Sequence, residues 1–171
     1  VNTLRLWGAR PTQHLDMCLF NRGEYTRALA ENNLVEVISQ VLYPEDSHEQ
    51  GKILRLKQQY FFVSASIQSI VRQFKKNGNN LADFAEKNVI HINDTHPSLA
   101  IPELMRILLD EGMTWDEAWQ IVTRTFAYTN HTIMHEALEK WPVALFKRVL
   151  PQISCIVEEI NERFCRSLWK L

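Results

Sequence analysis

The sequence has no apolar run that reaches about 18 residues, the length that a membrane-spanning helix requires. Glycine is also scarce, with five among 171 residues. None of these glycines belongs to a Gly-rich strand–turn–helix loop, the element that cradles nucleotide phosphates. The two absences argue against a membrane-spanning protein and against a nucleotide-cradling fold of this kind.

An excess of charge of either sign is missing as well. The 19 Lys and Arg residues nearly balance the 20 Asp and Glu residues, so the formal net charge is −1. The basic residues form one short cluster, Arg72, Lys75 and Lys76, and cations near the C-terminal end of a helix are more often a solvated terminus than a phosphate site. We therefore expect neither nucleic acid nor a membrane as a partner.

Cysteine occurs three times, at Cys18, Cys155 and Cys165, and no two cysteines form a C-x-x-C pair. This usage predicts reduced thiols in a cytoplasmic protein. Hydrophobic residues make up 46% of the chain, which is enough for a substantial core in one globular domain. Because the chain opens on Val1 inside an apparent strand, we expect a piece of a larger protein.

The clearest local pattern is a long helix over residues 53–74, where apolar side chains recur at steps of three and four along one face. A polar stretch containing Pro44 precedes it and resembles a linker. Residues 20–41 have a looser helical pattern, which predicts one or two helices. The opening residues 1–7 alternate in a way that predicts a strand.

The second half predicts two short strands, each followed by helices. Thr114 and Glu117 have the T-x-x-E spacing of a capping box, which predicts the start of a helix. The remainder is predicted to be helical, with breaks at Pro142 and Pro151. The two strands and the helix between them are predicted over residues 89–92, 125–129 and 98–109. The chain is therefore predicted to be α/β, helix-rich, with few short strands.

Both predicted strands end in polar side chains. Asn-Asp-Thr-His follows the first strand at 93–96, and Thr-Asn-His-Thr follows the second at 129–132. Ligands of open α/β sheets bind outside the carboxyl ends of strands, and each sugar hydroxyl both donates and accepts hydrogen bonds. These residues therefore suit a neutral polyhydroxylated ligand, but they are equally ordinary turn formers and helix caps. Residue chemistry alone leaves both interpretations open.

A metal site is a weaker alternative. His131 and His135 are four residues apart, with Glu136 beside the second, and two such histidines on a helix can share a metal ion. The order is H-x-x-x-H-E and not the H-E-x-x-H of zinc peptidases, so we do not expect a metal here.

Four strings identify a resemblance to a known family. The chain resembles the α-glucan phosphorylases, the glycogen, starch and maltodextrin phosphorylases, from Val1 to about Leu168. The strings are VNTLRLW, VLYPEDSHEQGKILRLKQQYFFVSASIQSIVRQF, INDTHPSLAIPELMR and AYTNHTIMHEALEKWPV.

The resemblance implies a reaction. In these enzymes inorganic phosphate cleaves the terminal α-1,4 bond of a glucan and releases glucose 1-phosphate, with pyridoxal phosphate as the cofactor. They are two-domain glycosyltransferases of the GT-B kind, and the cofactor lysine belongs to the C-terminal domain. Residues 1–171 resemble part of the N-terminal Rossmann-like domain, so no cofactor is expected on this chain and it is expected to be inactive alone.

The resemblance also assigns residues. His131 matches the histidine that hydrogen-bonds the glucose being transferred, and Asp94 and His96 match residues on the acceptor side, with Thr132 beside them. Tyr43 and Asp46 match the mobile loop that guards the catalytic site, and Ser47 stands there where many members have Asn.

Regulation and assembly are implied more weakly. Arg72 matches the first of two arginines that bind a nucleotide activator phosphate, but the second position is Gln73. Residues 20–41 match a helix at the dimer interface, so the parent enzyme is expected to be a cytoplasmic homodimer, and the short segment 77–88 resembles bacterial members. Two other functions stay open: a non-catalytic glucan-binding or regulatory module, and a helical scaffold.

Overall fold

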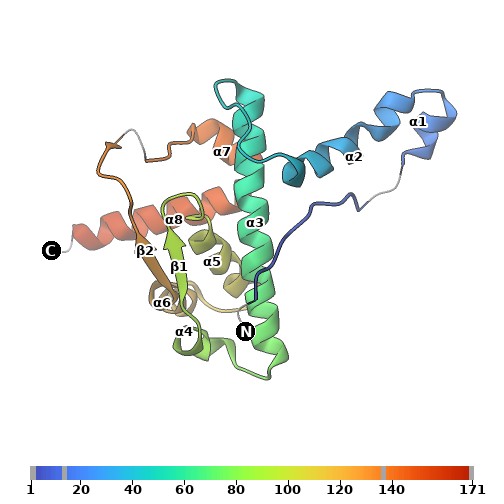
Figure 1. Cartoon of the computed structure of the whole chain (residues 1–171). Coiled ribbons are helices and arrows are strands. Elements are labelled where there is room, and N and C mark those ends of the chain that lie inside the picture. Colours follow the sequence, from blue (N-terminus) through green and yellow to red (C-terminus); the bar gives the residue numbers. More distant parts are fainter. Residues whose placement is uncertain (1–2, 13–14, 136–137, 170–171) are drawn as a thin grey trace. The chain divides into compact units, whose positions relative to one another are not determined.

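A computed structural model of the chain describes residues 3–12, 15–135 and 138–169 (Figure 1). The chain forms two compact units, residues 1–62 and 63–171. Within the described residues no helix combines the length and the apolar character needed to cross a membrane.

The first unit is helical. Asp16 caps its first helix, because its Oδ1 accepts hydrogen bonds from the backbone N–H of Cys18 at 2.9 Å and of Leu19 at 3.1 Å. The rings of Phe20 and Tyr25 pack edge to face at the junction between helices, with centroids 4.9 Å apart. The helices are α1 (Met17–Asn21), α2 (Tyr25–Gln40) and the first part of α3 (Glu49–Lys76).

The loop between α2 and α3 is fastened to the start of α3. Gly51 lies so close to the loop that a Cβ atom there would be 1.7 Å from the carbonyl oxygen of Glu45, so only glycine fits. Further along α3, Gln58 Nε2 donates to the carbonyl oxygen of Val41 at 2.7 Å. The loop conformation is therefore specified by contacts within this unit.

The second unit holds the remaining elements. After the end of α3 the chain forms a short 3₁₀ turn and a one-turn helix, and then alternates strands with helices (Figure 1). These elements are η1 (Leu81–Asp83), α4 (Phe84–Lys87), β1 (Ile90–Asn93), α5 (Ala100–Asp110), α6 (Trp115–Thr125), β2 (Phe126–Thr129), α7 (Val143–Val149) and α8 (Pro151–Leu168).

The sheet of the described residues has two strands, β1 and β2, paired in parallel. The register places Ile90 opposite Phe126 and Asn93 opposite Thr129. α5 packs against both α6 and α8. The core of this unit includes the fully or almost fully buried side chains Phe84, Leu104, Met105, Leu108, Ala118, Val122 and Ile153. A helix-rich α/β fold is therefore confirmed.

Local chemistry explains where the helices of this unit begin. Thr114 Oγ1 accepts from the backbone N–H of Glu117, and the Glu117 carboxylate accepts from the backbone N–H of Thr114 at 2.9 Å, so the predicted capping box is confirmed. Pro102 lies in the first turn of α5 and Pro151 opens α8, positions at which a proline removes no helical hydrogen bond. Gly112 ends α5 at φ +90°.

Two predicted elements are wrong. Among residues 1–7, the described residues 3–7 are not a strand; Leu4 and Leu6 are 84% and 86% exposed, and a strand requires a partner for its backbone groups. Residues 133–142 are mostly irregular in the described part, not helical; the chain leaves the strand in a local turn in which the hydroxyl of Thr132 accepts from the backbone N–H of Met134.

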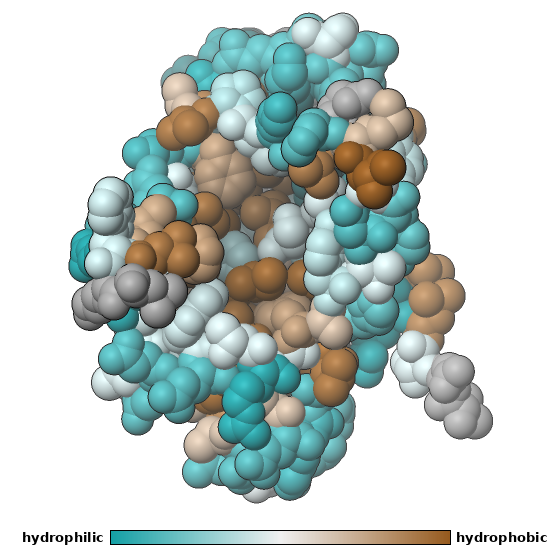
Figure 2. All heavy atoms as spheres, turned by 90° about the vertical axis from the view of Figure 1, so that its left-hand side faces the viewer, coloured by the Kyte–Doolittle hydropathy of each residue, from teal (hydrophilic) through white to brown (hydrophobic). Residues whose placement is uncertain are grey.

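The apolar side chains of α8 are only partly buried. Ile153 and Ile156 enter the core, but Phe164 and Leu168 at the other end of α8 are exposed. Figure 2, which turns the left-hand side of Figure 1 toward the viewer, shows hydrophobic surface on this face of the molecule. Trp115 and Trp119 of α6 are half-buried, and the guanidinium of Arg163 lies 4.9 Å from the centre of the Trp115 ring.

Candidate functional site

The candidate site is the edge of the sheet where β1 and β2 both end. Because the strands are parallel and Asn93 pairs with Thr129, the residues that follow each strand emerge side by side. The backbone N–H of Asp94 donates to the carbonyl oxygen of Thr129 at 2.9 Å and extends the ladder by one step. The two polar tetrads of the sequence therefore start at the same edge.

A direct side-chain contact joins the two strand ends. His131 Nε2 lies 2.6 Å from Asn93 Oδ1. One step back along the sheet, His91 Nε2 lies 2.6 Å from Thr129 Oγ1. Both histidines are exposed, so their rings face solvent while one ring nitrogen of each is engaged.

Asp94 turns the chain out of β1 in a left-handed conformation, with φ at +67°. Its Oδ1 accepts from the backbone N–H of Thr95 at 2.7 Å, and the turn continues through a 3.1 Å hydrogen bond from Ser98 N to Thr95 O. Asp and Asn tolerate this backbone conformation better than other non-glycine residues. The hydroxyl oxygen of Thr95 is buried without a hydrogen-bond partner in the described structure.

His96 lies after this turn and is half exposed. Its Nδ1 is 3.9 Å from Glu139 Oε1, and the Glu139 side chain is 12% exposed. His96 therefore contacts the irregular segment that follows β2, whereas His131 contacts β1.

Thr132 lies in a local turn. Its backbone N–H donates to Asn130 Oδ1 at 3.2 Å, and its Oγ1 accepts from the backbone N–H of Met134 at 3.1 Å. Asn130 Nδ2 closes the turn by donating to the carbonyl oxygen of Thr132 at 2.5 Å. This turn holds His131 at the end of β2.

The arrangement offers the Asp94 carboxylate, amide groups and imidazoles at one sheet edge, with the Glu139 carboxylate beside His96, which is a mixture of donors and acceptors. In the part of the chain that the structure describes, no three His, Cys, Asp or Glu side chains form a metal-ligand group. Glu136, the third member of the possible metal set with His131 and His135, lies outside the described residues.

The loop residues Tyr43, Asp46 and Ser47 belong to the first unit. Tyr43 has φ +58° and an exposed ring, and Asp46 forms an ion pair with Arg55 of α3. Ser47 donates its backbone N–H to Glu45 Oε1 at 2.9 Å. Hydrogen bonds from the backbone and then from the side chain of Ser47 hold the pKa of the Glu45 carboxyl below its usual value. The role of Tyr43, Asp46 and Ser47 in gating a catalytic site stays a prediction.

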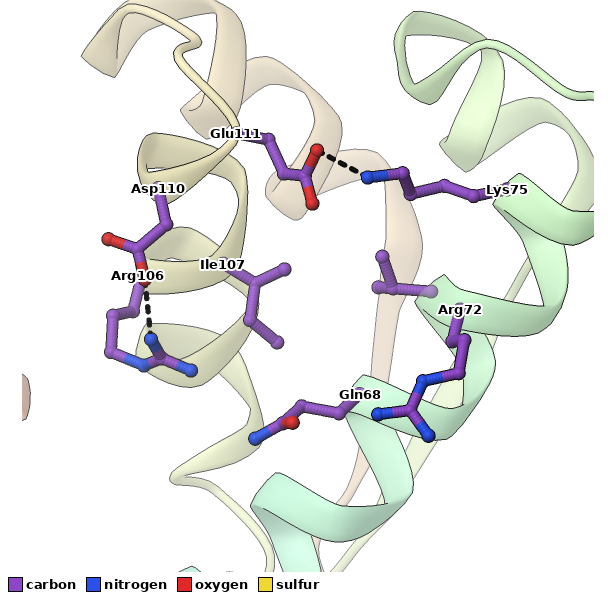
Figure 3. A pocket seen from close by; sticks show the side chains of 8 residues that line it. Gln68, Arg72, Lys75, Arg106, Ile107, Asp110 and Glu111 are labelled. Atoms are coloured by element: carbon purple, nitrogen blue, oxygen red, sulfur yellow. Dashed lines mark hydrogen bonds and ion pairs between the residues drawn. The ribbon is translucent and has the colours of Figure 1, made fainter.

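Arg72 lines a pocket of about 390 Å³ between α3 and α5 (Figure 3). Lys75 of α3 pairs with Glu111 across the pocket at 2.5 Å, and Arg106 of α5 pairs with Asp110 at 2.6 Å. The pocket therefore has both signs of charge, and the effector-phosphate role of Arg72 stays a prediction.

The structure adds partners that sequence reasoning did not assign. Asn93 contacts His131 and Glu139 contacts His96, and in each case the partners lie in different segments of the chain. The first pairing had a usable signal, because two strands that both end in polar tetrads predict neighbouring ends if the strands are parallel and in register. The second had no signal, since the irregular segment after β2 has no periodic pattern.

Comparison with known proteins gives a consistent result. The family profile described as "Carbohydrate phosphorylase" matches residues 1–171. The chain is 55% identical over 171 residues to a glycogen phosphorylase of Bacillus subtilis, which covers 99% of this chain and 20% of that protein. It is 53% identical over 171 residues to a glycogen phosphorylase of Saccharomyces cerevisiae, covering 99% of this chain and 19% of the relative.

The human muscle form of glycogen phosphorylase is 51% identical over 173 residues, which covers 96% of this chain and 20% of the relative. The chain thus spans about a fifth of the length of the curated relatives that it matches.

Proposed function

Because the chain belongs to the carbohydrate phosphorylase family, we propose that it is part of the N-terminal, Rossmann-like domain of an α-glucan phosphorylase of the GT-B kind. The full-length protein uses inorganic phosphate to cleave terminal α-1,4 bonds of a glucan and releases glucose 1-phosphate. The names of the relatives, all glycogen phosphorylases, support this reaction.

This part contributes the wall that binds the glucan. His131 hydrogen-bonds the glucose that is transferred, and Asp94, His96 and Thr132 line the side of the acceptor. The observation that supports this role best is the parallel pairing of β1 and β2, which brings Asp94 beside Thr129 and His131 against Asn93 at one sheet edge. Hydroxyl ligands require such a mixture of donors and acceptors.

The loop that carries Tyr43, Asp46 and Ser47 gates access to the catalytic site. The ion pair between Asp46 and Arg55 and the close approach of Glu45 to Gly51 support a loop with a defined resting conformation. Arg72 lines the pocket between α3 and α5. In members that a nucleotide activates, the matching arginine contacts the phosphate of the effector, and we assign Arg72 the same possible role.

Pyridoxal phosphate is the cofactor of the full-length protein. The described lysines of residues 1–171, however, are not suited to hold this cofactor as a Schiff base. A Schiff-base lysine requires a sheltered amine whose proton is removed easily. Every described lysine is exposed or half-buried, and Lys75 and Lys147 are held in ion pairs with carboxylates. No step of the reaction is therefore assigned to a lysine of this chain.

The full-length protein is a cytoplasmic homodimer. The exposed apolar side chains of α2 and of its surroundings, Tyr25, Leu29, Leu34 and Val41, support an interface on residues 20–41. The partners of the enzyme are the glucan, phosphate and glucose 1-phosphate.

The function is tested with the full-length protein. We expect phosphate-dependent release of glucose 1-phosphate from glycogen or a maltooligosaccharide, and absence of that release would overturn the proposal. The 171-residue chain alone is expected to release none. Isothermal titration of this chain with a maltooligosaccharide then separates a glucan-binding module, which binds the sugar without turnover, from a helical scaffold, which does not bind.

A further inference from the structure

We propose that Asn93 is a positioning residue for His131: its side-chain oxygen fixes the tautomer and the direction of the imidazole at the glucan site. This inference rests on the proposed function, in which His131 contacts the sugar. Its evidence, however, is the geometry of the two strand ends.

The contact between Asn93 and His131 is short and crosses the sheet. Asn93 is the last residue of β1, and His131 lies two residues beyond Thr129, the residue that pairs with Asn93. The distance from His131 Nε2 to Asn93 Oδ1 is 2.6 Å. An amide oxygen only accepts hydrogen bonds, so His131 Nε2 carries the hydrogen and donates.

The tautomer decides what His131 can offer a ligand. In the neutral ring with hydrogen on Nε2, Nδ1 keeps its lone pair and accepts. A sugar hydroxyl can donate to that nitrogen. Because His131 is exposed, loss of the Asn93 contact leaves its ring free to rotate and to exchange tautomers.

The backbone around the pair keeps the two residues in place. The 2.9 Å hydrogen bond from Asp94 N to Thr129 O continues the ladder past Asn93, and the turn formed by Asn130 and Thr132 encloses His131. Asn93 therefore acts from a fixed platform, which a positioning residue requires.

A neutral acceptor suits this role better than a carboxylate. An Asp at position 93 would also accept from Nε2, but its charge would favour the doubly protonated imidazolium, which cannot accept at Nδ1. Among the described residues, the titratable groups on the neighbouring segments are His91 on β1, Asp94 and His96 after β1, Tyr128 on β2, and His135, Glu139 and Lys140 after β2.

The test is a double-mutant cycle in the full-length protein. Asn93→Leu keeps the size of the side chain and removes the acceptor, and we expect it to lower kcat/KM for the glucan by about tenfold. In the His131→Ala background the same change is expected to have less than about a twofold effect, because its target is absent. Equal effects in both backgrounds would overturn the proposal, as would wild-type kcat/KM in Asn93→Leu when His131→Ala itself lowers kcat/KM.

Asn93→Asp supplies a readout that a merely structural role would not move. The Asp carboxylate can accept from Nε2, as the Asn oxygen does, but its charge favours the doubly protonated ring. We therefore expect kcat/KM of Asn93→Asp to be lowered at low pH and to approach the wild-type value as pH rises and the His131 ring becomes neutral. His91→Ala is the matched control, since it removes the other 2.6 Å cross-strand contact without touching His131. We expect it to change kcat/KM by less than about twofold, with unchanged thermal unfolding of all variants as the folding check.

A spectroscopic arm separates this inference from the proposed function. Long-range ¹H–¹⁵N spectra of histidine-labelled full-length protein report the tautomer, and the signals of His131 are those lost in His131→Ala. We expect hydrogen on Nε2 in the wild type and a mixture in Asn93→Leu; an unchanged ring in Asn93→Leu would overturn the inference. If the tautomer responds to Asn93 but His131→Ala has wild-type kcat/KM, positioning stands and the proposed role of His131 at the sugar fails.

Discussion

The buried carboxylate of Glu103 accepts two hydrogen bonds of 2.8 Å from the guanidinium of Arg106, one turn further along α5. It also accepts a 2.7 Å hydrogen bond from the hydroxyl of Ser64 on α3. The charge of a fully buried carboxylate is tolerated only when such partners replace water. This cluster ties α3 to α5 within the second unit.

Glu103→Ala is expected to lower the free energy of unfolding by about 3–5 kcal/mol, because it removes one partner of a buried ion pair. Asp110→Asn is the matched control: Asp110 also pairs with Arg106, but its side chain is 66% exposed, so the expected cost is below about 1 kcal/mol. Chemical denaturation of the variants measures both. Equal costs would show that burial of the Glu103 charge is not what makes the cluster important.

Gly51→Ala is expected to displace the loop over residues 43–48, because the added Cβ would lie 1.7 Å from the carbonyl oxygen of Glu45. Forcing an atom into such a contact costs roughly 1–3 kcal/mol. Thermal unfolding and the rate of proteolytic cleavage in the loop are the measurements. Gly8→Ala is the control, since a Cβ there meets nothing within 4 Å; similar behaviour of the two variants would contradict the assignment.

The capping box of α6 predicts a pH dependence. Hydrogen bonds from the hydroxyl and then the backbone N–H of Thr114 hold the pKa of Glu117 below its usual value in the folded protein. A carboxyl whose pKa is lowered on folding stabilises the protein above its unfolded-state pKa, and this contribution is lost as pH falls through the folded-state pKa. Glu117→Gln is therefore expected to be less stable than the wild type at neutral pH, with the difference vanishing in acid.

Urea unfolding at several pH values measures that difference. Thr114→Ala should cost about 1 kcal/mol, typical of a lost N-cap, and should return the Glu117 pKa toward its usual value in a carboxyl ¹³C titration. A Glu117 pKa that does not respond to Thr114→Ala would contradict the assigned cause.

The sequence predicted correctly those elements whose signals lie within a few neighbouring residues. The long apolar stripe of α3 and the T-x-x-E sequence at Thr114 correspond to structures whose determining contacts lie within a few residues, and both predictions are confirmed. The strand predicted at residues 1–7 is wrong because a strand depends on partners distant in sequence. The same reason explains why the contact of His96 with Glu139 was not predicted.

Within the candidate site, the polar residues could be named from the sequence but their pairing could not. The positive φ of Asp94 and the hydrogen bond between Asn93 and His131 depend on the register of β1 against β2. A shift of one residue would have turned Asn93 to the opposite face of the sheet.

Two substitutions of Asp94 distinguish its role in the backbone turn from its role toward the glucan acceptor. Asp94→Ala is expected to lower the free energy of unfolding by about 1–2 kcal/mol, because alanine resists the left-handed conformation that φ +67° requires, whereas Asp94→Asn should be nearly neutral. In the full-length protein Asp94→Asn should nevertheless change the use of glucan acceptors, since it removes the charge at the acceptor side. Unfolding curves and the dependence of the rate on glucan length measure the two effects, and wild-type acceptor use in Asp94→Asn would leave Asp94 a turn residue only.

The most direct measurement is kcat/KM for phosphorolysis by the full-length protein with His131→Ala, compared with Glu162→Ala. Glu162 pairs with Arg166 at the surface of α8, and its side chain is 60% exposed. If the ends of β1 and β2 form the glucan wall, His131→Ala lowers kcat/KM by up to about a hundredfold, the effect of a hydrogen bond that tightens in the transition state, and Glu162→Ala changes it by less than about twofold. Equal, small effects of the two substitutions would contradict the glucan-wall assignment and leave the polar strand ends as turns and helix caps.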